Sequence, residues 1–149
     1  MSLNNLYQQM ILEHNKNPRN FKQVAAYTHY SHGHNPLCGD DFVVMVRLTD
    51  DNIIEDIGFT GQGCAISKAS GSLMTQALKG KRLTDALLVK DNFLSLITQD
   101  DYKGIDLGKL KVFEGVKKYP VRVKCAALVW RALEDALNKT SDQHLVSTE

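Results

Sequence analysis

The chain has 149 residues, of which 43% are hydrophobic and 23% charged, a size and composition that fit one globular domain and exclude disordered, collagen-like and disulfide-dense proteins. Eighteen basic and 17 acidic residues give a net charge of +1, so composition gives no reason to expect nucleic acid or an anionic membrane as a partner. The longest apolar run, 125–130, is too short to span a bilayer, and no signal segment opens the chain, so we expect a cytoplasmic protein.

The first predicted element is an amphipathic helix. Apolar residues recur at helical spacing from Leu3 onward, and Asn17-Pro18 ends the pattern because the residue before a proline avoids the α region. His14 lies on the apolar stripe, where we expect a packed histidine at the edge of the core rather than a metal ligand.

A β-hairpin is predicted next. Residues 42–48 have strong β character, 49–52 are turn-forming, and 53–60 alternate as a second strand. Strict alternation places Ile53 on the face of Ile57 and turns Ile54 to the other face. The polar and aromatic segment 25–33 before the hairpin is expected to be a short strand or an irregular arm.

The rest of the chain is mainly helical. A stripe from Ile66 to Leu78, closed by Gly80, predicts one helix; 83–96 predicts one or two more, and 98–118 is the least periodic part. Pro120 precedes a further helix whose apolar face includes Cys125. We therefore expect one α+β domain over 1–149, with helices packed on one face of a small antiparallel sheet, a core over about 3–138 and a flexible tail over 140–149.

The basic residues are unevenly distributed. Residues 103–131 contain eight basic and two acidic side chains, so this segment carries +6 and the remainder −5. The segment is either a solvated face or a docking patch whose field stabilises anions near Cys125. The small net charge of the whole chain disfavours a nucleic-acid-binding zinc protein.

Three cysteines lie at element boundaries. Cys38 precedes the first hairpin strand and Cys64 follows the second, so the antiparallel hairpin makes them neighbours, whereas Cys125 cannot be placed in this way. Asp40 supplies a carboxylate at the same end, and three thiolates with one carboxylate suit tetrahedral Zn²⁺ or an iron–sulfur cluster.

Other interpretations of these residues stay open. A free cysteine is most often a small buried hydrophobe, an Asp after a Gly most often forms a turn, and the spacing matches no simple zinc finger. Alternating histidines on the arm, at His29, His32 and His34, are competing ligands.

Three motifs, taken in order, resemble the U-type iron–sulfur cluster scaffold family: NPLCGD at 35–40, GQGCAISKAS at 61–70 and VKCA at 123–126. The resemblance runs from Leu6 to Leu137 and implies that family's α+β fold with a three-stranded antiparallel sheet. Two features resemble the SufU branch rather than the IscU branch: Lys124 stands where IscU-type scaffolds carry histidine, and 98–118 resembles an insertion of about 20 residues that marks the SufU branch.

The resemblance implies a zinc-dependent sulfurtransferase that assists a partner rather than a free-standing enzyme. It implies Zn²⁺ held by Cys38, Asp40, Cys64 and Cys125, and a pyridoxal-phosphate-dependent cysteine desulfurase of the SufS type as sulfur donor. In that branch a partner histidine replaces the first-motif cysteine on zinc, which implies Cys38 as the acceptor. Arg122 and Lys124 are candidates to steady the site or the partner, or they are simply an exposed helix start.

Two alternatives accompany this interpretation. In one, Cys38, Cys64 and Cys125 bind a transient [2Fe–2S] cluster that the protein assembles and transfers to apo acceptor proteins. In the other, the chain is a binding protein whose zinc only stabilises the fold. Neither involves a nucleic acid or a membrane.

Overall fold

The structure is a computed structural model of the chain, in which residues 3–138 and 145–147 are described. Four α-helices, one 3₁₀ helix and four strands follow one another as α1 (Leu3–Lys16), β1 (His29–Asn35), β2 (Asp40–Leu48), β3 (Ile54–Gln62), α2 (Ala65–Leu78), α3 (Leu83–Thr98), η1 (Gly108–Lys118), α4 (Pro120–Asn138) and β4 (Leu145–Ser147). None of the helices in these described ranges is both long and apolar enough to cross a membrane.

The strands form a single sheet in the order β3-β2-β1-β4. β1 pairs antiparallel with β2, and β2 pairs antiparallel with β3, which confirms the expected three-stranded antiparallel sheet. β4 adds a short parallel strand on the outer edge of β1. β4 lies within the segment that was predicted to be a flexible tail. A strand forms there because the outer edge of β1 offers unpaired backbone N–H and C=O groups, which can pair with a segment of almost any sequence. The other residues of that predicted tail lie outside the described ranges.

The predicted hairpin is present, with one correction to its register. The pairing shifts between Arg47 and Leu48, so that Arg47 faces Asp56 while Leu48 faces Ile54. This bulge reverses the side-chain alternation at the start of β3, and Ile54 enters the core fully buried, while Ile53 is only half-buried. The prediction that Ile53 shares the face of Ile57 was therefore wrong.

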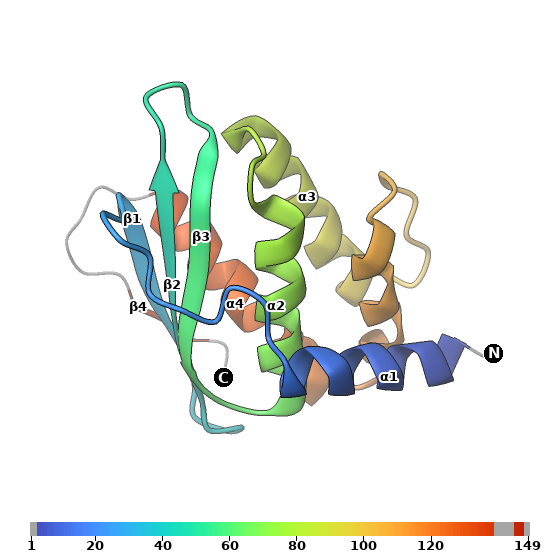
Figure 1. Cartoon of the computed structure of the whole chain (residues 1–149). Coiled ribbons are helices and arrows are strands. Elements are labelled where there is room, and N and C mark those ends of the chain that lie inside the picture. Colours follow the sequence, from blue (N-terminus) through green and yellow to red (C-terminus); the bar gives the residue numbers. More distant parts are fainter. Residues whose placement is uncertain (1–2, 139–144, 148–149) are drawn as a thin grey trace.

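Helices cover one face of the sheet, as expected for an α+β domain (Figure 1). α4 packs across β1, where Gly33 lets it approach so closely that a Cβ atom there would lie 3.1 Å from Leu128. α2 packs beside α4, α1 packs on α2, and α3 with η1 packs against α4 on the side away from the sheet. The segment between α1 and β1 crosses the opposite face of the sheet (Figure 1).

Buried aromatic side chains fix the direction of α4. Trp130 stacks on Phe93 of α3 with ring centroids 4.4 Å apart, and its Nε1–H donates to Ser70 Oγ of α2 at 3.0 Å. Ser70 in turn donates to the Ala126 carbonyl at 2.7 Å. α2, α3 and α4 are thus joined by directional contacts as well as by apolar packing, and the first half of α4 is held against the end of the sheet.

The structure defines the helices of the two segments that the sequence left least certain, 83–96 and 98–118. The segment 83–96 is one helix, α3, rather than two. The aperiodic segment ends in η1, whose three residues per turn bury Leu110, Phe113 and Val116 at a spacing of three. Pro120 is the first residue of α4, a position where its missing N–H has no intrahelical partner to lose.

Candidate metal centre

Cys38 lies in the tight turn that joins β1 to β2. Its backbone N–H donates to the Asn35 carbonyl at 3.2 Å, and Gly39 supplies the left-handed conformation, with φ 71°, that the turn requires. Pro36 and Leu37 on the same turn are exposed, and the Cys38 side chain is half-buried. The turn therefore holds the Cys38 thiol at the rim of the molecule.

Asp40 and Cys64 meet where β2 begins and β3 leads into α2. The Asp40 carboxylate is fully buried, and its Oδ1 accepts the Cys64 backbone N–H at 2.7 Å while Oδ2 lies 3.7 Å from Cys64 Sγ. Cys64 is also the N-cap of α2, where its Sγ accepts the Ser67 N–H at 3.5 Å. The carboxylate therefore orients Cys64 as well as facing the site.

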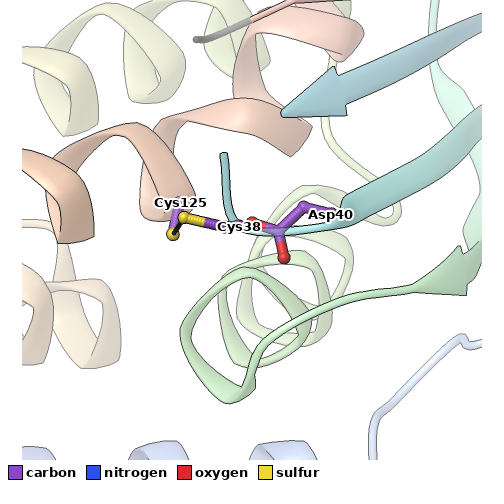
Figure 2. A group of neighbouring side chains, drawn as sticks. All are labelled: Cys38, Asp40 and Cys125. Atoms are coloured by element: carbon purple, nitrogen blue, oxygen red, sulfur yellow. Dashed lines mark hydrogen bonds between the residues drawn. The ribbon is translucent and has the colours of Figure 1, made fainter. Parts of the chain in front are cut away.

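Cys125 comes from α4 and is 3% exposed. Its Sγ lies 3.2 Å from Cys38 Sγ, although 87 residues separate the two in the chain. Figure 2 shows both thiols beside the Asp40 carboxylate, at the place where the turn before β2 meets α4. The ligand atoms of Cys38, Asp40 and Cys125 all lie within 4.8 Å of one another.

Of the four residues that the sequence singled out, the structure groups Cys38, Asp40 and Cys125 at the spacing of a metal site and places Cys64 beside Asp40. Cys38 Sγ has the sulfur of Cys125 as its neighbour, at 3.2 Å, and Cys64 contacts both Asp40 and Cys125. The hairpin argument placed Cys38 and Cys64 at the same end of the sheet, but α4 inserts its own thiol next to Cys38.

The thiols affect one another's proton affinity. Hydrogen bonding from the Cys125 thiol lowers the pKa of Cys64 to about 6, with help from Ser67 and against the effect of burial. The same contact with Cys64, followed by burial and the contact with Cys38, raises the pKa of Cys125. The cluster therefore favours one thiolate among its cysteines, and a bound cation is needed to hold all of them deprotonated.

These donors fit a tetrahedral metal. Around Zn²⁺, sulfur lies at about 2.3 Å and oxygen at about 2.0–2.2 Å, which puts neighbouring ligand atoms about 3.5–3.8 Å apart. The Cys38–Cys125 separation of 3.2 Å and the Cys64–Asp40 separation of 3.7 Å are close to this spacing. Each of these two pairs therefore has the separation expected of neighbouring ligands on one tetrahedral ion.

The other predicted candidates lie outside this group. His29 contacts Thr28 at 2.7 Å, and His32 contacts Asp41 on the neighbouring strand. Within the described ranges no histidine joins a cluster of metal-ligating side chains. Lys124 is exposed, and Arg122 stacks over the Tyr119 ring at 4.6 Å.

Sequence reasoning missed two residues at the site. Ser67 caps the Cys64 sulfur, and it occupies the third position after an N-cap, where such contacts are common. Asn35 shapes the Cys38 turn, since its Oδ1 accepts the Leu37 N–H at 3.2 Å, a signal present in the Asn-Pro pair.

The sequence of this chain is similar to those of known proteins. The family described as NifU-like N terminal domain matches residues 6–138. The zinc-dependent sulfurtransferase SufU of Bacillus subtilis (strain 168) is 44% identical over 139 residues, covering 93% of each chain. The iron-sulfur cluster assembly scaffold protein IscU of Streptococcus pyogenes serotype M1 is 38% identical, covering 96% of this chain and 90% of that protein.

A solved structure supports the same fold. The crystal structure of a candidate iron-sulfur cluster assembly scaffold for the SUF system, from Fervidobacterium islandicum AW-1, superimposes with a TM-score of 0.82 at 32% sequence identity. The superposition covers 89% of this chain and 97% of the Fervidobacterium chain. The similarity therefore extends over nearly the whole domain, and the family match over residues 6–138 spans the positions of all four candidate ligands.

Proposed function

This chain belongs to the family of NifU-like N-terminal domains, the family of the SufU and IscU iron–sulfur cluster assembly scaffolds, and from that premise we propose that it accepts sulfur from a cysteine desulfurase at a zinc site formed by Cys38, Asp40, Cys64 and Cys125. The observation that carries the proposal is the convergence of these side chains from the β1–β2 turn, the start of β2, the start of α2 and α4.

Cys38 is the acceptor in this proposal because a partner can reach it. Its thiol lies on an exposed turn beside Leu37, which is 71% exposed, whereas Cys125 is 3% exposed. Cys64 is held at its helix start by Ser67 and Asp40. Cys64, Cys125 and Asp40 therefore remain as ligands when Cys38 reacts.

The transfer conserves atoms and electrons. The donor carries a persulfide, R–S–SH, and the Cys38 thiolate attacks its outer sulfur. The S–S bond of the donor breaks, a new S–S bond forms on Cys38, and the donor thiolate leaves and takes up a proton. Bound zinc would keep the protein's thiols deprotonated and protected before the donor arrives.

The basic segment 103–131 presents exposed side chains to a docking partner. Tyr119 and Val121, at the start of α4, are 50% and 59% exposed. Lys103, Lys117 and Arg131 of the basic segment pair with nearby carboxylates. In contrast, four exposed lysines of this segment make no ion pair with any described residue: Lys109, Lys111, Lys118 and Lys124. This pattern favours a docking patch for an acidic partner over a fully compensated face.

The test mixes the zinc-loaded protein with a SufS-type desulfurase and cysteine, and follows alanine release. We expect strong stimulation by the wild type, none by Cys38→Ala, and wild-type stimulation by Leu88→Ala, which removes an exposed side chain on α3 away from the site. Alkylation and mass spectrometry should find one added sulfur atom on Cys38.

The same mixture separates the alternatives. Full activity of Cys38→Ala would show that another cysteine accepts the sulfur. Absence of stimulation, together with a stable coloured cluster after anaerobic reconstitution with iron and sulfide, would assign the chain to cluster assembly instead. Elemental analysis of the purified protein gives the metal-to-protein ratio and distinguishes zinc from iron.

A further inference from the structure

The side-chain amide of Asn35 is a buried donor without an acceptor. Asn35 is fully buried, its Oδ1 accepts the Leu37 N–H at 3.2 Å, and its Nδ2 makes no hydrogen bond in the structure. Buried polar groups are nearly always paired, because an unmade hydrogen bond leaves the full cost of removing the group from water. The unused donor therefore indicates an acceptor that becomes available when a group binds nearby.

The sheet register places this amide beside the candidate metal centre. Asn35 is the direct partner of Asp40 across the β1–β2 ladder, and both side chains are fully buried. Side chains that face each other in an antiparallel pair lie on the same side of the sheet, with Cβ atoms about 4.5–5.5 Å apart. The Asp40 carboxylate is itself within 4.8 Å of the sulfurs of Cys38 and Cys125.

The contacts along β1 indicate which part of α4 the amide faces. Ser31 Oγ donates to Asp135 at 2.8 Å, and two residues further along, Gly33 lies against Leu128 and Ala132. The strand thus runs toward the beginning of α4, and two more residues bring Asn35 opposite the turn of α4 that carries Cys125. Cys125 as a residue is only 3% exposed, so water has little access to solvate its thiolate.

We propose that Asn35 Nδ2 donates an N–H···S hydrogen bond to the metal-bound sulfur of Cys125, which makes Asn35 a positioning residue of the site. The inference rests on the proposed metal site and adds to it a residue that acts through a ligand. Without metal, Cys125 carries its thiol proton, and its Sγ lies 3.2 Å from Cys38 Sγ. As a metal ligand it has lost that proton and needs donors.

The hydrogen bond has a consequence for sulfur transfer. A thiolate that accepts an N–H hydrogen bond carries less negative charge on its sulfur and is therefore a poorer nucleophile. Hydrogen bonds of this kind tune the properties of metal-bound sulfurs in many proteins. Cys125 would therefore stay a ligand, while Cys38, on the exposed turn, keeps its reactivity. The amide of Asn35 thus directs the incoming sulfur to one of the cysteines.

Two substitutions separate this role from turn formation. Asn35→Asp keeps the acceptor for the Leu37 N–H and removes the donor, whereas Asn35→Ala removes both. If the donor matters, Asn35→Asp weakens metal binding at least as much as Asn35→Ala, by about 10–100-fold in competition with a chelator. If the side chain only shapes the turn, Asn35→Asp binds metal like the wild type, and the inference is wrong.

Ser31→Ala is the matched control, because it removes a buried hydrogen bond on the same face of the same strand, away from the metal site. We expect its metal affinity to equal that of the wild type. Cobalt substitution gives a second readout: the sulfur-to-cobalt charge-transfer band should shift in Asn35→Asp and stay unchanged in Ser31→Ala. Circular dichroism of the metal-free variants checks that each one folds.

NMR tests the hydrogen bond directly in the unmodified chain. In ¹⁵N-labelled protein, one of the two Asn35 side-chain amide protons should move downfield and exchange more slowly on zinc loading. In ¹¹³Cd-loaded protein that proton should couple to the metal through the shared sulfur. If the wild type binds metal through its cysteines but the Asn35 amide does not respond, this inference fails and the proposed function stands. If the wild type binds no metal through its cysteines, the proposed function fails first.

Discussion

Asp40 has two roles at the candidate metal centre. One carboxylate oxygen accepts the Cys64 backbone N–H at 2.7 Å, and the other lies beside the Cys64 sulfur at 3.7 Å. Because the side chain is fully buried, its orientation depends on the atoms packed around it rather than on water. The geometry of the site is therefore sensitive to residues that touch Asp40 without being ligands.

Gly63 is such a residue. A Cβ atom at this position would lie 2.6 Å from Asp40 Oδ1 and 2.6 Å from the Phe42 ring, and neither neighbour has free space to move into. We predict that Gly63→Ala displaces the carboxylate and weakens zinc binding by about 10–100-fold, the usual effect of disturbing a group that orients a ligand. Chelator competition on the purified variant measures this change.

Gly115→Ala is the control for Gly63→Ala. A Cβ atom added at Gly115, in η1, meets no atom within 4 Å, so this substitution adds the same methyl group without a clash. Zinc affinity should be unchanged in this variant. If Gly63→Ala also binds zinc like the wild type, the carboxylate is not held as tightly as its contacts indicate.

At the scale of secondary-structure elements, the hairpin could be predicted from sequence and the position of α4 could not. The hairpin depends on residues close together in the chain, namely two β-rich runs and the turn between them. The sequence pattern was therefore enough to predict that Cys64 and Asp40 lie close together at one end of the sheet. Cys125 reaches the site because Trp130, Ser70 and Gly33 dock α4 across three other elements. Contacts between distant segments leave no periodic signal in one sequence.

The same reason explains the smaller errors. The bulge at Arg47 and Leu48 and the parallel strand β4 are set by what pairs with them, not by the residues themselves. Resemblance of the three motifs to a known family supplied Cys125 as a partner of the other two cysteines, which the residues alone did not.

α1 docks on α2 through a histidine that must stay neutral. His14 is 3% exposed, and its Nδ1 lies 2.7 Å from Ser72 Oγ, which also accepts the Arg19 backbone N–H at 2.8 Å. The Ser72 hydroxyl still has its own proton, which a neutral His14 ring can accept at Nδ1 and a protonated ring cannot. Burial, then the charges of Arg19 and of Lys109 on η1, lower the pKa of His14 below 6.5, while Glu13 on α1 opposes them.

This arrangement predicts a loss of stability in mild acid. Above pH 6.5 the histidine is neutral in both states; below it the unfolded chain binds a proton that the folded chain resists, so the free energy of unfolding falls as pH decreases. His14→Gln, which cannot be protonated, should lose less stability between pH 7 and pH 5. Urea unfolding of both metal-free proteins at each pH measures the difference, because the cysteines and carboxylates contribute equally to both.

The outcome has a simple check. If wild type and His14→Gln show parallel stability curves between pH 7 and pH 5, His14 is as easily protonated in the folded chain as in the unfolded one. The α1–α2 contact would then not depend on its neutral form.

Considered as a whole, the molecule has a hydrophobic core to which none of the four candidate ligands belongs. The largest fully buried side chains, among them Trp130, Phe42 and Phe93, come from α4, β2 and α3, and the candidate ligands lie at one end of this core. Sites in small zinc domains, in contrast, supply most of the folding energy and leave the chain unfolded without metal. A purely structural zinc would resemble the second case.

We therefore predict that chelation lowers the melting temperature without unfolding the protein. At free zinc a hundredfold above its Kd, binding adds about 2.7 kcal/mol to the free energy of unfolding. In a chain of this size each kcal/mol shifts Tm by about 2–4 °C, so the metal-free protein should melt roughly 5–10 °C lower. Far-ultraviolet circular dichroism at 25 °C should be the same with and without zinc. A spectrum that collapses on chelation would instead assign the metal a structural role and remove the reason to regard Cys38 as free to leave it.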